Sequence, residues 1–83
     1  MGMMLNPARE VSVRCDLEGL PRHLASHPLH GDLRPVLHWR ADVDWWEQPV
    51  ARDYWRVLLE ERLLLEIYND LKSGLWYLER VFD

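Results

Sequence analysis

Hydrophobic and polar residues alternate most regularly between residues 36 and 46. Apolar side chains occupy every second position, at Leu37, Trp39, Ala41, Val43 and Trp45. The positions between them are polar, at His38, Arg40, Asp42 and Asp44. A helix would scatter these apolar residues around its circumference, whereas a strand gathers them on one face. The pattern predicts a half-buried strand over Val36–Trp46, with Trp39, Val43 and Trp45 pointing into the core.

The first half of the chain shows a weaker pattern of the same kind. Apolar residues occur at alternate positions, at Val11, Val13, Cys15 and Leu17, which predicts a strand with one apolar face. Glu18-Gly19 is a candidate hairpin turn before a return strand over Leu20–Ala25. That strand should lie at an edge or be irregular, because Pro21 has no N–H. Residues 1–9 are expected to form a loose lead-in, and residues 26–35 the longest loop.

Residues 53–72 are the ambiguous part of the chain. Their composition favours a helix. At about 100° per residue, however, the apolar side chains would point in almost every direction, and an amphipathic helix needs one apolar stripe. Two strands, Tyr54–Leu59 and Leu63–Asn69, joined by the turn Glu60-Glu61-Arg62, would sort them onto faces. We favour this hairpin, although the turn lacks the Asn-Gly or Asp-Gly pair that would decide against the helix.

The last residues complete a β pattern. Asn69–Gly74 is a cluster of turn-forming residues, and Leu75–Phe82 follows as a final strand. Together the segments predict an all-β fold, a small antiparallel meander of five or six strands that forms a curled sheet or partial barrel. A single domain is expected to cover residues 10–83.

Length and charge limit the number of domains and the kinds of partner that the chain can have. Eighty-three residues make one domain, close to the lower limit at which a single core is sufficient. The net charge is −4, and residues 42–83 carry ten acidic against five basic residues, which disfavours nonspecific binding to phosphate backbones. The five tryptophans indicate a core or contact surface built on aromatic side chains.

Several features bear on cellular location. The single cysteine, Cys15, cannot form an internal disulfide, and its position predicts a buried, inert thiol. The first residues lack the basic region of a signal peptide, and no apolar run has the length of a membrane-spanning helix. We therefore expect a cytoplasmic protein.

Four motifs in the second half form a recognisable set. They are Trp45-Trp46-Glu47, Asp53-Tyr54-Trp55-Arg56-Val57, Glu66-Ile67-Tyr68-Asn69-Asp70 and Gly74-Leu75-Trp76-Tyr77-Leu78-Glu79-Arg80-Val81-Phe82-Asp83. Over residues 36–83 the chain resembles a small bacterial domain family of unknown function. That family is similar in turn to the C-terminal tail of the catalytically inactive Y-family polymerase homologue of bacterial mutagenesis cassettes.

The resemblance implies an all-β fold, a turn at Glu60-Glu61-Arg62 and a loose association with DNA repair. It implies no catalytic residues, since none is assigned in the family. The chain departs from the family pattern at that turn, which usually contains a glycine, and at Asn69, which stands where a basic residue is usual.

Two groups of side chains could support chemistry. The histidines His23, His27, His30 and His38 could bind Zn²⁺ or Ni²⁺ if the fold gathered them. Prolines interrupt any helix that would align them, and no Cys or Glu at ligand spacing completes the set, so we expect exposed loop histidines and no metal or cofactor. Asp42 and Asp44 share a strand face, as paired catalytic carboxylates would, but a solvated strand face has the same composition. No phosphate loop or nucleophile motif is present, so the sequence predicts no enzyme.

Adjacent aromatic residues provide the candidate binding surface. Neighbours in a strand face opposite sides, so Trp45-Trp46, Tyr54-Trp55 and Trp76-Tyr77 each place one ring on each face. Rings left exposed near arginines could anchor a protein partner or stack on bases, and otherwise they would form a second small core. The candidate partner-binding residues are Trp46, Tyr54, Arg56, Trp76, Tyr77 and Phe82.

These features together predict a non-catalytic protein-interaction module, and the resemblance adds a role as an accessory of bacterial DNA repair or translesion synthesis. The alternative is a single-stranded nucleic-acid-binding domain that uses exposed aromatics and arginines. An open sheet leaves strand edges, and the terminal strand carries few polar residues to protect its edge. We therefore expect a homodimer or a complex with another protein, with Trp76, Tyr77 and Phe82 near the contact.

Overall fold

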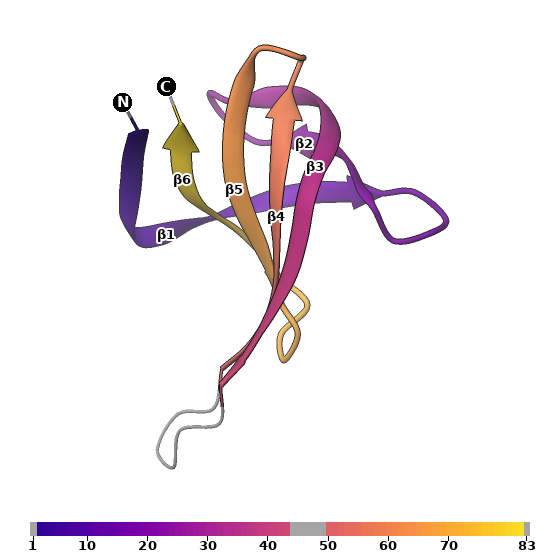
Figure 1. Cartoon of the computed structure of the whole chain (residues 1–83). Helices are drawn as coiled ribbons and strands as arrows, with labels where there is room; N and C mark the ends of the chain where they lie inside the picture. Colours follow the sequence, from indigo (N-terminus) through magenta and orange to yellow (C-terminus); the bar gives the residue numbers. More distant parts are fainter. Residues whose placement is uncertain (1, 44–49, 83) are drawn as a thin grey trace.

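Six antiparallel strands make up the computed structural model of this chain, which describes residues 2–43 and 50–82. The strands are β1 (Gly2–Cys15), β2 (Pro21–Ala25), β3 (His30–Val43), β4 (Val50–Leu59), β5 (Leu63–Asp70) and β6 (Trp76–Phe82). Each strand pairs with the next, and β6 pairs with β1, so the sheet closes into a barrel (Figure 1). The predicted all-β antiparallel meander is confirmed.

The ambiguous segment is a hairpin and not a helix. Strands β4 and β5 pair continuously from Arg52↔Asp70 to Leu59↔Leu63. The turn between them closes with a hydrogen bond from Arg62 N to Leu59 O at 3.0 Å. Glu60 and Glu61 have positive φ values of 53° and 57°, as the two central residues of a type I′ turn do, a conformation that Asn-Gly usually supplies.

The barrel extends further toward the N-terminus than the sequence predicted. The expected loose lead-in over residues 1–9 is wrong for residues 2–9, because β1 begins at Gly2 and its first residues pair with the end of β6, as in Gly2↔Phe82. Apolar residues do not alternate with polar ones in this segment, where Met3, Met4 and Leu5 are consecutive, so its pairing with β6 is not visible in its own pattern. The irregular strand expected at Pro21 is confirmed, since Pro21 pairs with Cys15 where the β1–β2 register shifts.

The expected long loop over residues 26–35 is also wrong, because β3 begins at His30. Its first residues pair with β2, as in Ala25↔His30. A β-bulge between Pro35 and Leu37 then shifts the register against β4. A bulge accommodates a proline within a strand, since Pro cannot donate to the ladder.

The bulge decides which face of β3 lies inside the barrel. Before it, Leu33 lies opposite the buried Leu59, on the inner face. After it, Leu37 and Trp39 point outward, and Leu37 is 51% exposed. The prediction that Trp39 points into the core is therefore wrong. Asp44, Trp45 and Trp46 lie outside the described residues, as do the side chains of Asp42 and Val43.

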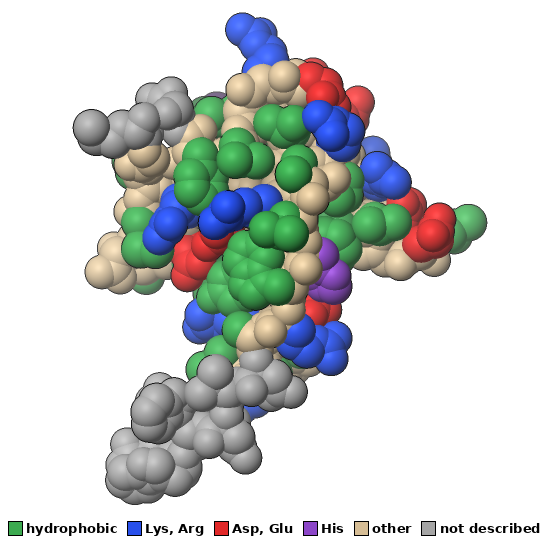
Figure 2. Space-filling model, in the orientation of Figure 1, with side chains coloured by type: hydrophobic (Ala, Val, Ile, Leu, Met, Phe, Trp, Pro, Cys, Tyr) green, Lys and Arg blue, Asp and Glu red, His purple; other side chains and the backbone are tan. Residues whose placement is uncertain are grey.

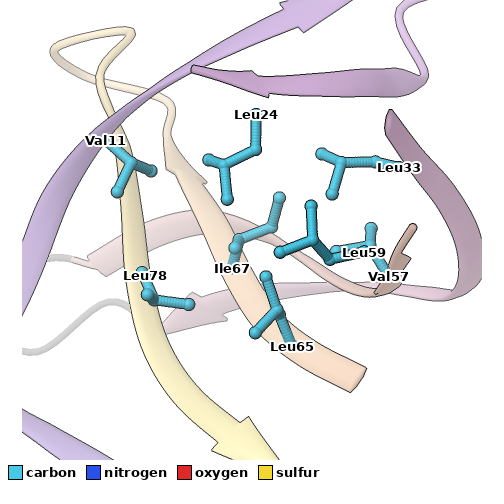
Figure 3. Close-up of a cluster of buried hydrophobic side chains, with 8 residues drawn as sticks. All are labelled: Val11, Leu24, Leu33, Val57, Leu59, Leu65, Ile67 and Leu78. Carbon is cyan, nitrogen blue, oxygen red and sulfur yellow. The ribbon is translucent and has the colours of Figure 1, made fainter. Parts of the chain in front are cut away.

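The core is aliphatic and not aromatic. Its buried members are Val11, Leu24, Leu33, Val57, Leu59, Leu65, Ile67 and Leu78, contributed by every strand of the barrel (Figure 3). Leu24, Val57, Leu65 and Ile67 are completely buried. Trp55 and Trp76 are only partly buried and pack against this cluster from its margin. Burial of these side chains is the main source of stability in so small a domain.

Two further predictions on the surface are corrected by the barrel. The terminal strand is no edge, because β6 pairs with β5 on one side and with β1 on the other.

Cys15 is exposed and not buried, because the register shift at Arg14/Cys15 takes it off the inner face. Partial desolvation and the neighbouring Asp16 raise the pKa of its thiol, which disfavours the reactive thiolate. Within the described residues, no helix has the length and apolar character needed to cross a membrane.

Candidate interaction face

A row of aromatic side chains crosses the outer face of four consecutive strands. Trp39 on β3 lies opposite Tyr54 on β4, Tyr54 opposite Tyr68 on β5, and Tyr68 opposite Tyr77 on β6. The ring centroids are 5.3, 5.2 and 5.1 Å apart along the row. Aromatic pairs at this spacing stabilise both the sheet and each other.

Arginine side chains lie on these rings. The Arg52 guanidinium carbon is 4.4 Å from the Tyr68 ring centre, and Arg52 Nη1 donates a hydrogen bond to Tyr54 Oη at 3.1 Å. Arg56 lies between two rings, 4.9 Å from that of Phe82 and 5.6 Å from that of Trp39. The Arg80 guanidinium carbon lies 5.6 Å from the centre of the same Phe82 ring. Cation–π contacts of this kind fix the positions of both partners.

Two glutamates lie beneath the arginines. Glu66 is 6% exposed, and its Oε1 accepts a hydrogen bond from Arg56 Nε at 3.3 Å. Burial and the adjacent Glu66 carboxylate raise the pKa of Glu79 above its ordinary value. Burial also raises the pKa of Tyr68, so its hydroxyl stays neutral and can donate a hydrogen bond. Figure 2 shows this mixture as a basic strip above acidic side chains, bordered by hydrophobic ones across β4–β6.

We call this surface the aromatic–arginine face. It comprises Trp39, Arg52, Tyr54, Arg56, Glu66, Tyr68, Tyr77, Glu79, Arg80 and Phe82. Residues 65–68 of β5 are buried on both sides of the sheet, the inner side by the core and the outer side by this layer. The second small core, which was the alternative to exposed rings in the sequence analysis, is therefore present, and arginines cover its outer side.

Four of the six predicted partner-binding residues meet on this face: Tyr54, Arg56, Tyr77 and Phe82. Trp76 does not, because it lies on the inner side opposite Val11 and packs against the core. Trp46 lies outside the described residues. Trp39 and Arg52 were missed, although aligning Tyr54 with Tyr68 across the predicted hairpin would have placed Arg52 beside them.

The other candidate groups are dispersed. His23 Nδ1 lies 3.2 Å from Asp32 Oδ1, and the His38 ring stacks on Trp55 at 3.9 Å. Arg40, a polar position of the predicted strand over residues 36–46, pairs with Asp53 at 2.9 Å on the opposite face of the sheet. Among residues 2–43 and 50–82, no three His, Cys, Asp or Glu side chains gather as a metal site would require.

Comparison with known proteins adds no relative: no family model, curated protein or solved structure matches the chain. The resemblance to the mutagenesis-cassette domain therefore stays a prediction from the sequence.

Proposed function

We propose that this protein is a non-catalytic domain that binds another protein through the aromatic–arginine face. The observation that carries the proposal is the row from Trp39 to Tyr77 with arginines seated on its rings. Tyrosine, tryptophan and arginine are the residues most enriched at the energetic centres of protein interfaces. Mutual stacking already orders these side chains, so binding a partner loses little conformational entropy.

A protein partner suits this face better than a nucleic acid. The flat surfaces of Tyr54 and Tyr68 are already covered by neighbouring rings and by Arg52, whereas base stacking needs a free ring surface. Glu66 and Glu79 place negative charge in the centre of the face, where a phosphate backbone would approach. Nucleic-acid binding nevertheless remains the second candidate function, because arginines and aromatics occur together here.

The setting of this binding activity rests on the sequence resemblance alone. That resemblance extends the proposal to an accessory role in bacterial DNA repair or translesion synthesis, with the partner a protein of that system. The proposal also includes a homodimer, in which the protein partner bound through the same face is a second copy of the chain.

Site-specific photocrosslinking in cells tests the proposal. A benzophenone-bearing phenylalanine analogue replaces Tyr77 on the face, and Leu17 in the β1–β2 turn is the control position because it is fully exposed. We expect a discrete protein adduct, or a second copy of the chain, from position 77 and not from position 17. An adduct pattern that is the same at both positions would contradict the proposal.

A second substitution checks that the arginines contribute. Arg80→Ala in the Tyr77 crosslinking variant should reduce the yield of the adduct at least about fivefold. Arginines at interfaces commonly contribute about 1 kcal/mol or more to the free energy of binding. Arg14→Ala is the matched control, because Arg14 is exposed on β1 and away from the face. Equal loss in both variants would mean that charge alone, and not this face, holds the partner.

A further inference from the structure

An apolar pocket of about 290 Å³ opens beside the core, on the opposite side of the sheet from the aromatic–arginine face. Strand β1, the β2–β3 connection, the start of β5 and the middle of β6 surround it. The apolar residues that define it are Leu5, Val11, Leu24, Leu29, Leu78 and Val81. Within the described residues, none that lines it belongs to the aromatic–arginine face.

The floor of the pocket is the hydrophobic core itself. Val11, Leu24 and Leu78 belong to the buried cluster and lie together on its β1 side (Figure 3). Met3 lines the outer part and is more than half exposed. An unbranched methionine adapts to ligands of different shape. A pocket of this kind would bury most of a small apolar molecule.

A single cationic side chain stands at the rim. Arg9 projects from β1, and its Nη2 donates a hydrogen bond to the backbone carbonyl of His27 in the β2–β3 connection. A guanidinium carries five N–H donors, so this bond leaves others available for a ligand. No Asp or Glu is among the described residues that line the pocket. The rim is therefore positive above an apolar body.

We propose that this pocket binds a small carboxylate with an apolar body, a short alkyl or aryl carboxylate. Its apolar part would lie on Leu24 and Leu78, and its carboxylate would accept charge-assisted hydrogen bonds from the Arg9 guanidinium. The volume fits this class, because an apolar cavity of about 150 Å³ is known to hold benzene and this one is about twice that size. The site is independent of the proposed protein-binding face.

Isothermal titration of the whole chain with octanoate tests the proposal, with octanamide as the uncharged analogue. We expect octanoate to bind at least about tenfold more tightly than octanamide, because a charge-assisted hydrogen bond commonly contributes that much. Arg9→Gln should remove this preference and leave octanamide binding unchanged. Arg14→Gln, on the same strand but outside the pocket, should change neither. Absence of octanoate binding, or binding that Arg9→Gln leaves unchanged, would overturn the proposal.

Two further arms exclude other occupants of the pocket. Leu5→Trp should fill the pocket and abolish octanoate binding while the circular dichroism spectrum stays that of the folded chain. A peptide ending in a free leucine carboxylate that binds when octanoate does not would assign the pocket to a protein C-terminus and overturn the small-molecule proposal. Self-association of the unsubstituted chain that Leu5→Trp abolishes would likewise assign it to a second copy.

Discussion

Gly31 lies directly against the Glu60 side chain: a Cβ atom at Gly31 would fall 2.6 Å from Glu60 Oε2. The two residues join the start of β3 to the β4–β5 turn. Glu60 N donates a hydrogen bond to Asp32 O at 2.9 Å, and Asp32 N donates to the Glu60 carboxylate in return. A turn glutamate thus closes one end of the barrel, and glycine is required beneath it.

Gly31→Ala should therefore be costly. Its φ of +142° strains any other residue, and the added methyl would collide with Glu60. We expect a loss of about 2–3 kcal/mol in the free energy of unfolding, measured by urea denaturation. Gly19→Ala is the matched control, because Gly19 also has a positive φ, of +85°, but nothing lies within 4 Å of the added atom. It should lose only about 1 kcal/mol.

The contribution of the contact itself can be separated from backbone strain. In a Glu60→Ala background, the additional loss from Gly31→Ala should fall toward that of Gly19→Ala, since the colliding carboxylate is gone. Equal losses from Gly31→Ala in both backgrounds would show that strain alone explains the effect.

Substitutions in β5 and β3 should show that the core is aliphatic. Ile67 is completely buried, so Ile67→Val should lose about 1 kcal/mol and Ile67→Ala about 2–5 kcal/mol, close to the whole stability of the domain. Trp39→Ala removes only a half-buried outer ring and should lose about 1–2 kcal/mol. Chemical denaturation measures all three. A larger loss of stability from Trp39→Ala than from Ile67→Ala would contradict the assignment of the core to the inner, aliphatic face.

Two carboxylates should give opposite pH dependences. The pKa of Glu79 is raised above 4.5 in the folded protein, chiefly by burial, so the folded state holds its proton more tightly than the unfolded chain. Stability associated with this group is therefore present below pH 4.5 and lost as the pH rises through the folded pKa. Glu79→Gln should stabilise the protein at pH 7 and change little at pH 4, measured by thermal denaturation.

Asp53 provides the comparison of opposite sign. Its hydrogen bond with Arg40 lowers its pKa below 3.8 in the folded state. The stability it contributes is present above pH 3.8 and lost as the pH falls through the folded pKa. Asp53→Asn should therefore weaken the fold at pH 7, and the difference from the unsubstituted protein should shrink at pH 3. A parallel change for Glu79 and Asp53 variants would contradict both pKa directions.

Single-stranded DNA should bind weakly if the aromatic–arginine face serves a protein partner. We expect a thymidine oligonucleotide to quench tryptophan fluorescence little at about 150 mM salt. The measurement is repeated with Arg52→Gln, because Arg52 covers the Tyr68 ring that a base would need. Tight binding that weakens steeply with salt would favour the nucleic-acid function instead.

The strands could be predicted from the sequence where the pattern of apolar and polar residues depends only on neighbouring positions in the chain. Alternation over residues 36–46 indicated a strand, and the scattered leucines of residues 53–72 indicated a hairpin, because both signals depend only on near neighbours. Alternation identifies which residues share a face but not which face is inside. For Trp39, the bulge after Pro35 determines which face of β3 lies inside the barrel, and that bulge arises from the pairing of β3 with β4.

The candidate site was predictable in part for the same reason. Tyr54, Arg56, Tyr77 and Phe82 could be proposed as exposed because strand neighbours alternate. Trp76 was misassigned because its burial depends on β1, a strand more than sixty positions earlier in the chain, as the pair Val11↔Trp76 shows. The pocket at Arg9 had no local signal, since its walls come from segments far apart in the sequence: β1, the β2–β3 connection, the start of β5 and β6.

Pairing of β1 with β6 also sets the order in which the protein can fold. The hairpins β3–β4 and β4–β5 join residues close in sequence, whereas Gly2↔Phe82 joins the first and last described residues. Contacts between such distant residues form slowly, because a long loop must close first. We therefore expect the ring to close last and the pocket to be completed in that same step. A molecule bound there would slow the opening of the ring, and occupancy of the pocket would govern the lifetime of the folded chain.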